Sequence, residues 1–126
     1  MIYGIGVDLV KVARLESGLA RFGEHYADRL LAPEEHQEFF TAADPARFLA
    51  KRFAAKEAFA KAAGTGLRPP LHLRSLAITH TTLGQPGLSF HPELASWLQQ
   101  RGITGHHLSL SDEQEYVIAY VVLEKN

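Results

Sequence analysis

The sequence predicts an α+β fold in which a small, mainly antiparallel sheet packs against a long central helix. Two observations lead to this prediction. Strand-like patterns occur at the start of the chain and again after residue 75, whereas most helical patterns are grouped between residues 12 and 63. Partial segregation of helices and strands favours α+β over an alternating α/β architecture. The length of 126 residues, without repeats or linkers, predicts a single domain over 1–126.

The chain opens with a predicted strand. Three apolar residues alternate with two glycines and an aspartate, in the order Gly4, Ile5, Gly6, Val7, Asp8 and Leu9. This period of two is expected for a strand with one packed face, and the apolar side is the side expected to pack. The glycine side carries no bulk, so a ligand or another backbone is expected to approach there, beside the Asp8 carboxylate.

Three helices are expected next. Residues 12–22 form an amphipathic pattern whose outer face carries Arg14 and Arg21. A short helix is expected over 33–41, because its leading proline suits a first helical position and the two acids that follow suit the helix dipole. The third helix, over 45–63, has apolar stripes on two sides, so we expect it to be central and largely buried.

The remainder of the chain is predicted to hold two strand pairs separated by a helix. The expected ranges are 76–82 and 87–91 for the first pair, 92–102 for the helix with its glycine stop, and 106–111 and 116–123 for the second pair. The first pair reads as a hairpin that turns through Leu83, Gly84, Gln85 and Pro86.

Composition narrows the class of protein. Hydrophobic residues make up 46% of the chain and charged residues 21%, which is the balance of a folded globular protein. The absence of cysteine excludes disulfides and thiolate zinc sites, so a cytosolic location is expected. No apolar run approaches the roughly 20 residues of a membrane span. The net charge of -1 disfavours a protein that coats nucleic acid, so we expect neither a nucleic-acid nor a membrane partner.

The charges are nevertheless uneven. Between residues 46 and 63, five cations accompany a single acid: Arg47, Lys51, Arg52, Lys56, Lys61 and Glu57. One hypothesis is a non-catalytic module that binds acidic protein or nucleic acid through this helix. It explains the cations but not the acid among them, nor the bare glycine face beside Asp8.

Asp8 and Glu57 are the candidate chemical groups, and each has a plainer interpretation. Asp8 could serve only as a turn or helix-cap carboxylate. Glu57 falls at the edge of an apolar stripe, where a carboxylate needs a partner, and Lys61 could supply one as an i,i+4 pair. Alternatively, both acids bind Mg²⁺, which is usually held by one or two carboxylates with phosphate oxygens and water. Lys61 would then neutralise charge on a transferring or leaving phosphate.

Other familiar sites are not supported. The chain lacks phosphate-loop, dinucleotide-binding and serine-hydrolase motifs, and its seven histidines show no metal-binding spacing. His107 shares a strand face with Ser109 and Ser111, which indicates either a solvated face or a ligand contact.

Two motifs resemble those of one enzyme family. Gly6-Val7-Asp8 and the segment Phe53-Ala54-Ala55-Lys56-Glu57-Ala58-Phe59-Ala60-Lys61 are similar to the paired signature G-[IV]-D and F-x-x-K-E-A-x-x-K of 4′-phosphopantetheinyl transferases. Further stretches resemble the compact bacterial holo-[acyl carrier protein] synthase branch. They are residues 2–10, 47–52, 64–66 and 107–111. The chain differs from the family pattern at Leu83 and at Ser111-Asp112.

This resemblance implies a transfer reaction, its cofactor and its partners. The 4′-phosphopantetheine arm of coenzyme A would pass to a serine of apo acyl carrier protein, with release of adenosine 3′,5′-bisphosphate. Asp8 and Glu57 match the family's Mg²⁺ ligands and Lys61 its phosphate-contacting lysine. Coenzyme A contacts are implied for Arg52, Gly64, Thr65, Gly66, Gly84, Gln85, Pro86 and His107. The family is trimeric with active sites at subunit boundaries, and the apolar run 117–123 is compatible with such packing.

The resemblance also implies an acidic helix on the protein substrate. Arg14 and Arg21 are seven residues apart and therefore lie on one helix face, two turns apart. Gly18, near the same line, is expected to leave a gap between them for a second helix. We therefore expect Arg14 and Arg21 to bind acyl carrier protein, the alternative being two ordinary solvated cations.

Overall fold

The computed structural model describes all residues from 1 to 126. Its elements follow the chain as β1 (Ile2–Lys11), α1 (Val12–Phe22), α2 (Glu24–Leu30), a 3₁₀ turn η1 (Pro33–Glu35), α3 (His36–Thr41), α4 (Pro45–Ala63), β2 (Leu76–His80), β3 (Pro86–Phe90), α5 (Pro92–Gln100), β4 (Ile103–Asp112) and β5 (Tyr116–Lys125). The α+β class is confirmed, and no helix is long and apolar enough to cross a membrane.

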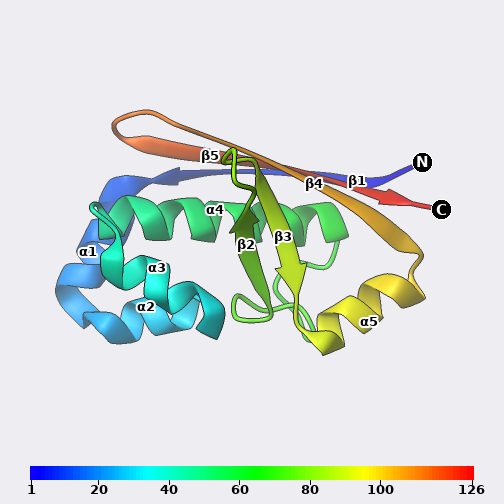
Figure 1. The fold of residues 1–126 in the computed structure, drawn as a ribbon, viewed down its shortest axis with the longest axis horizontal. Coiled ribbons are helices and arrows are strands. Elements are labelled where there is room, and N and C mark those ends of the chain that lie inside the picture. Colours follow the sequence, from blue (N-terminus) through cyan, green and yellow to red (C-terminus); the bar gives the residue numbers. More distant parts are fainter.

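Two antiparallel sheets pack around α4, which runs through the middle of the molecule (Figure 1). The larger sheet has the strand order β1-β5-β4, and the smaller one is the hairpin β2-β3. Helices α1, α2 and α3 lie at one end of α4, and α5 lies beyond the hairpin at the other end (Figure 1). The N-terminal strand and the C-terminal strand are therefore neighbours, paired from Ile2 with Glu124 to Lys11 with Tyr116.

Most expected elements are confirmed, and one was missed. The predicted range 45–63 is the range of α4, where Asp44 caps the first turn by accepting a hydrogen bond from the Arg47 N–H. Helix α2 was not predicted. Its seven residues follow Gly23, which adopts a φ of 63° and breaks the helical path after α1. A helix of two turns gives too few repeats for a periodic signal.

The orientation of β1 is the reverse of the prediction. Gly4 and Gly6 face α4, and a Cβ atom on either would lie 2.0 Å from a backbone carbonyl oxygen, that of Ala62 and of Ala58 respectively. Of the two neighbours expected at the glycine side, a ligand or another backbone, the structure shows another backbone, that of α4. Ile5 and Leu9 point away from α4 and are 56% and 62% exposed.

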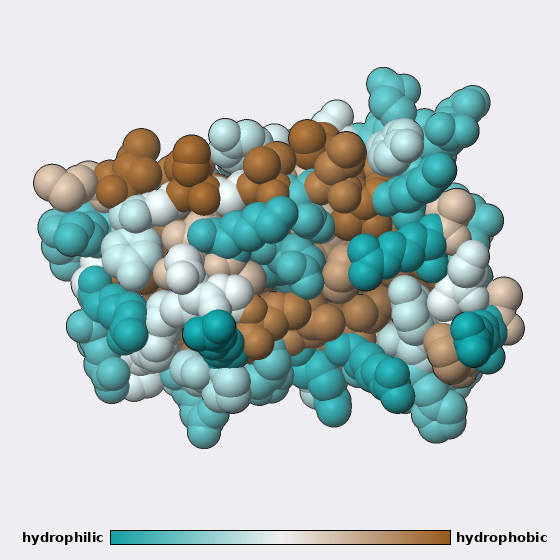
Figure 2. All heavy atoms as spheres, turned by 180° about the vertical axis from the view of Figure 1, so that it is seen from behind, coloured by the Kyte–Doolittle hydropathy of each residue, from teal (hydrophilic) through white to brown (hydrophobic).

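An apolar strip consequently covers the outer face of the larger sheet. The register pairs Val7 with Tyr120 and Leu9 with Ile118, so these side chains share one face. Figure 2 shows hydrophobic side chains gathered along the edge of the molecule where this sheet lies. The exposed members of this outer sheet face are Ile5, Val7, Leu9, Tyr116, Ile118 and Tyr120.

Beneath the sheet, α4 holds a buried ionic network. Lys56 is fully buried and donates to the carbonyl oxygens of Leu30 at 2.9 Å and Leu73 at 2.8 Å and to Glu35 Oε1 at 2.5 Å. All three ammonium hydrogens thus have acceptors. Burial lowers the pKa of Lys56, and the Glu35 carboxylate opposes that shift. Arg52 joins the same network through Glu35 Oε2 at 3.1 Å.

The expected cationic surface is therefore smaller than the sequence indicated. Two of its five cations, Arg52 and Lys56, point into the protein, where they tie α4 to η1 and to the start of the hairpin. Removing one partner of such a network leaves a buried charge without compensation, which is strongly destabilising.

The contact between β1 and α4 leads to a stability prediction. Gly6→Ala should lower the free energy of unfolding by about 3 kcal/mol or more, because the new methyl group would overlap the Ala58 carbonyl. Gly87→Ala in β3 is the matched control, since its Cβ would meet only the Thr79 hydroxyl, and it should cost about 1 kcal/mol or less. Urea denaturation of both variants measures the difference, and equal costs would contradict the close-contact account.

Candidate functional site

Asp8 and Lys61 meet where β1 crosses the second half of α4. Lys61 Nζ lies 3.1 Å from Asp8 Oδ1 and donates at 2.9 Å to the Val7 carbonyl oxygen. The Asp8 side chain is only 16% exposed, whereas the Lys61 side chain is 54% exposed. The i,i+4 pair that would have explained Glu57 is not formed, because Lys61 turns to Asp8 instead.

Glu57 is half-buried beside this pair and has no ion-pair partner within 4.0 Å. Burial raises the pKa of Glu57, and the nearby Asp8 carboxylate raises it further. The cations Lys61 and Arg14 act in the opposite direction. Two carboxylates that repel one another, with only partial compensation, form a site where a cation would be favourable.

The donor set at this position fits Mg²⁺. Asp8 and Glu57 offer hard oxygen ligands, and no cluster of three or more His, Cys, Asp or Glu residues occurs in the protein. Mg²⁺ typically uses one or two carboxylates and completes its shell with water and phosphate oxygens. The pair therefore suits a metal that is bound together with a phosphate-bearing ligand.

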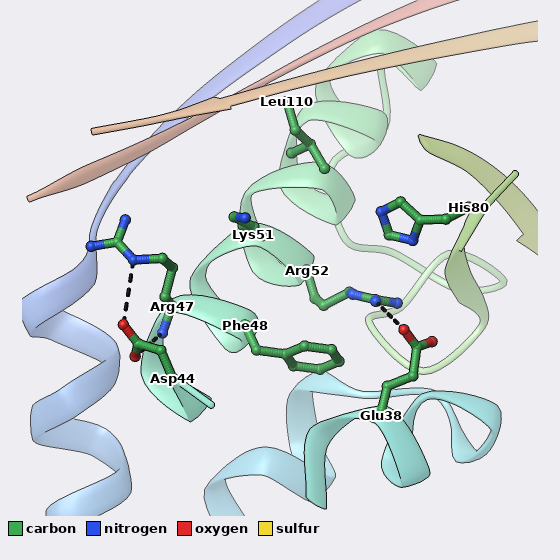
Figure 3. A pocket seen from close by; sticks show the side chains of 8 residues that line it. All are labelled: Glu38, Asp44, Arg47, Phe48, Lys51, Arg52, His80 and Leu110. Atoms are coloured by element: carbon green, nitrogen blue, oxygen red, sulfur yellow. Dashed lines mark hydrogen bonds and ion pairs between the residues drawn. The ribbon is translucent and has the colours of Figure 1, made fainter. Parts of the chain in front are cut away.

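A second polar site, of about 270 Å³, lies beside the first half of α4 and is called here the Arg52 pocket. Figure 3 shows side chains from α3, α4, β2 and β4 around it. Its lining residues are Glu38, Asp44, Arg47, Phe48, Lys51, Arg52, His80 and Leu110. Three permanent cations in one hollow suit an anionic ligand. Burial, followed by the charge of Arg52, lowers the pKa of His80, which favours its neutral form.

Arg52 is 4% exposed and borders this pocket from the protein interior. Its Nη1 donates to Glu35 Oε2 at 3.1 Å and to the Ile78 carbonyl oxygen at 2.8 Å, while its Nη2 donates to Glu38 Oε2 at 3.2 Å. The guanidinium also lies 4.4 Å from the centre of the Phe48 ring. Its orientation is thus determined by four groups, one each from η1, α3, α4 and β2.

Asp112 is bound to the same end of α4. Arg47 Nη1 donates to Asp112 Oδ2 at 2.9 Å and to the Glu113 carbonyl oxygen at 2.7 Å, and Arg47 Nη2 donates to the Gln114 carbonyl oxygen at 2.6 Å. Lys51 Nζ lies 3.6 Å from Asp112 Oδ1. Asp112, at which the chain differs from the family pattern, is therefore bound by the same arginine that holds the β4–β5 turn through two carbonyl oxygens.

The glycine-containing loop after α4 borders a different hollow. Gly64 ends α4 in a left-handed conformation, with a φ of 82°, and the Gly66 N–H donates to the Ala60 carbonyl oxygen. This hollow is separate from the Arg52 pocket. It is lined by Gly64, Thr65, Arg68, Pro69, Trp97 and Arg101. The loop follows Lys61 directly and so lies at the same end of α4 as the two carboxylates.

The remaining predicted coenzyme A residues lie on the hairpin and on β4. The Thr81 N–H donates to the Gln85 carbonyl oxygen at 3.0 Å, and Gly84 adopts a φ of 90° in that turn, before Pro86 begins β3. His107 is exposed on the outer sheet face, where its Nε2 lies 2.6 Å from Glu124 Oε1. The hydrogen bond to His107 lowers the pKa of Glu124.

The carboxylate pair and the Arg52 pocket lie on opposite flanks of α4. Glu57 and Arg52 are five residues apart, which places them about 140° apart around the helix. Asp8 belongs to β1 at one edge of the larger sheet, whereas the pocket residue Leu110 belongs to β4 at the other edge. Within a single chain, the same end of a bound ligand therefore cannot contact both the carboxylate pair and the Arg52 pocket.

The region around Arg14 and Arg21 differs in one respect from the prediction. Both arginines are exposed on α1, with Arg14 5.2 Å from the centre of the Phe53 ring and Arg21 5.2 Å from that of Phe22. Gly18, however, leaves no gap for a second helix. It is buried, and a Cβ there would lie 2.2 Å from the Tyr26 ring, which fills the space from the unpredicted helix α2.

Sequence reasoning missed the residues that hold Arg52 in place. Glu35 was interpreted as a favourable charge at a helix start, yet it is 1% exposed and accepts hydrogen bonds from Lys56, Arg52 and backbone N–H groups. Glu38 and His80 carried no motif. No local pattern identifies such partners, since the contacts join residues 14 to 43 positions apart.

Comparisons with known proteins show the family to which the chain belongs. The family model of the 4′-phosphopantetheinyl transferase superfamily matches residues 4–121. The chain is 56% identical to the holo-[acyl-carrier-protein] synthase of Thiobacillus denitrificans, over 100% of this chain and 96% of that protein. The crystal structure of the holo-[acyl-carrier-protein] synthase of Neisseria meningitidis is similar with a TM-score of 0.97 and 50% identity, over 99% of this chain and 100% of that chain.

A more distant solved structure carries a ligand. The holo-(acyl-carrier-protein) synthase of Bacillus anthracis, in complex with CoA (3′,5′-ADP), is similar with a TM-score of 0.82 and 31% identity, over 100% of this chain and 99% of that chain.

The chain therefore belongs to the 4′-phosphopantetheinyl transferase superfamily and is an enzyme of that class. The further stretches of resemblance, residues 2–10, 47–52, 64–66 and 107–111, predicted the holo-[acyl carrier protein] synthase branch in particular. Full-length similarity to proteins of that name confirms this prediction.

Proposed function

We propose that the protein transfers the 4′-phosphopantetheine arm of coenzyme A to a serine of apo acyl carrier protein, with Mg²⁺, in the cytoplasm. The observation that supports this most directly is the convergence of Asp8, Glu57 and Lys61 at one point. The site offers two hard ligands and a cation, which suits the diphosphate of coenzyme A. The Bacillus anthracis relative, in complex with CoA, supports the choice of donor.

The reaction breaks the phosphoanhydride bond of coenzyme A and forms a phosphoester bond to the carrier protein. The serine oxygen of the carrier protein forms a bond to the phosphorus that bears the pantetheine arm. The bond from that phosphorus to the bridging oxygen breaks, and adenosine 3′,5′-bisphosphate leaves with its electron pair. The serine proton passes to a base, for which Glu57, Asp8 through a water, and another water are the candidates.

Asp8 and Glu57 would hold Mg²⁺, which when bound neutralises the diphosphate and makes the phosphorus more electrophilic. Lys61 contributes from the protein itself. Its ammonium is fixed by Asp8 and the Val7 carbonyl, close to where charge develops on the leaving phosphate. A fixed cation stabilises that charge without reorganisation during the reaction.

The nucleotide end of coenzyme A is assigned to the Arg52 pocket of a neighbouring subunit. The pocket supplies Arg47, Lys51 and Arg52 for phosphate, but it lies on the opposite flank of α4 from Asp8 and Glu57. A complete site therefore needs two chains, with the β1 flank of one facing the β4 flank of the next. Contacts of this head-to-tail kind form a ring when the rotation between neighbouring chains closes.

The outer sheet face supports the same assembly. Six large apolar or aromatic side chains are exposed there in a single protomer, and such a patch marks an interaction surface. We propose that three chains pack through this face into the homotrimer that the family resemblance implies. His107 lies on the same face and would then be available to a ligand bound at a subunit boundary.

The protein substrate is assigned to α1. Arg14 and Arg21 are exposed, and Arg14 is close enough to Glu57 for its charge to lower the pKa of that carboxyl group. An acidic helix that pairs with both arginines would thus bring its serine near the carboxylate pair.

Mass spectrometry tests the proposed transfer. Apo acyl carrier protein incubated with coenzyme A, Mg²⁺ and the enzyme should gain the mass of one phosphopantetheine group. No mass gain under these conditions, with a folded enzyme, would refute the proposal.

The carboxylate pair is tested by isosteric substitution. Asp8→Asn and Glu57→Gln should each lower the transfer rate about 100-fold or more, because each removes a hard ligand and a negative charge from the metal site. Glu93→Gln, an exposed acid on α5, is the control and should keep the full rate. A variant that keeps near wild-type turnover at limiting Mg²⁺ would not have lost a ligand.

The proposed trimer is tested by a charge on the outer sheet face. Ile118→Glu should leave the protomer folded, since this side chain is 40% exposed, but it should prevent assembly and abolish transfer. Analytical ultracentrifugation gives the mass, with Gln100→Glu on α5 as the control. A wild-type protein that sediments as a single chain, or an active single-chain variant, would exclude the shared site.

The docking surface is tested by charge reversal. Arg14→Glu combined with Arg21→Glu should raise the Michaelis constant for acyl carrier protein by about tenfold or more, with little effect on that for coenzyme A. The defect should shrink with salt, as the Debye length falls below about 10 Å above 0.1 M. Arg74→Glu with Lys125→Glu makes the same change in net charge elsewhere. If both double variants behave alike, docking at α1 is wrong.

A further inference from the structure

The cations of the Arg52 pocket are compensated by acids that line it or lie beside it. Arg47 pairs with Asp44 and Asp112, Lys51 pairs with Asp112, and Arg52 pairs with Glu38. Three cations thus meet three carboxylates before any ligand arrives. An incoming phosphate must displace one of these acids if it is to form a direct ion pair.

Two of the three acids take part in further contacts, because Asp44 accepts from the backbone and Asp112 is bound by both Arg47 and Lys51. Asp44 caps α4 through the Arg47 N–H, and Asp112 shares Arg47 with the carbonyl oxygens of the β4–β5 turn. Displacing either acid would therefore disturb a helix start or a turn.

The Glu38 carboxylate takes part in no such further contact. Its carboxylate makes one ion pair, with Arg52 Nη2 at 3.2 Å, and its side chain is 57% exposed. Figure 3 shows it reaching from α3 across to the guanidinium. Glu35 and the Ile78 carbonyl hold the other nitrogen of Arg52 independently. Arg52 would therefore keep its orientation after Glu38 moved away.

We propose that Glu38 is an internal competitor for the anionic nucleotide end of the donor, and thereby sets the affinity of the Arg52 pocket. The carboxylate occupies Arg52 Nη2 when the pocket is free, moves aside when a phosphate binds, and returns when the ligand leaves. This rests on the proposed function, in which coenzyme A and adenosine 3′,5′-bisphosphate share the same nucleotide end. Glu38 accordingly weakens the binding of the donor and of the product alike, and it prevents the product from blocking the site.

Glu38→Gln tests the proposal, because the amide keeps the shape of the side chain but removes its charge. Isothermal titration calorimetry with adenosine 3′,5′-bisphosphate should give a dissociation constant about two- to fivefold lower than that of the wild type, the range for one ion pair that solvent reaches from the Glu38 side. Coenzyme A should show the same factor, and the gain should shrink as salt is added.

Glu34→Gln is the matched control. It makes the same charge change four residues earlier, where the carboxylate pairs with His91 outside the pocket, and it should leave both dissociation constants unchanged. The melting temperature of Glu38→Gln should stay close to that of the wild type, since the buried Arg52 keeps its contacts with Glu35 and the Ile78 carbonyl oxygen.

Two results would overturn the proposal. Weaker binding by Glu38→Gln would mean that Glu38 positions Arg52 for the ligand, and unchanged binding would mean that the ligand phosphate never meets Arg52 Nη2. The mass-spectrometric transfer assay on the wild type decides the proposed function separately. If transfer occurs and Glu38→Gln binds no more tightly, the internal competitor is refuted while the function stands.

Discussion

The close approach of β1 to α4 is the contact on which the rest of the structure depends. Gly4 and Gly6 let the strand lie against the carbonyl oxygens of Ala62 and Ala58, where any side chain would overlap the helix. This approach brings Asp8 beside Lys61 and Glu57. It also turns the apolar side of β1 outward, so the same contact creates both the carboxylate site and the exposed surface proposed for assembly.

Two adjacent residues in α4 have different roles, one structural and one chemical. Lys56 points inward and is held by Glu35 and two carbonyl oxygens, whereas Glu57, about 100° further round the helix, faces the Asp8 side. The buried ammonium links the helix to distant segments by directional hydrogen bonds, which fix the rotation of α4 about its axis. That rotation places Glu57 on one flank and Arg52 on the other.

The two flanks differ in electrostatic character. On the β1 flank, Asp8 and Glu57 repel one another, and the raised pKa of Glu57 reflects that repulsion together with burial. On the other flank, each cation already has an acid. One flank is therefore suited to attract a metal and the other to exchange one anion for another, which suits the proposed binding of a polyanionic donor and release of a polyanionic product.

The sequence by itself determined the α+β class, the range of α4 and the identity of Asp8, Glu57 and Lys61 as a group, because helical period and local motifs are short-range properties. It predicted the wrong packed face for β1, since alternation shows that two faces differ but not which one meets a helix. Helix α2, the Tyr26 ring against Gly18, and the Glu35 and Glu38 partners of Arg52 were decided by tertiary structure alone. Each depends on residues that are distant in sequence and become neighbours only after the chain has packed around α4.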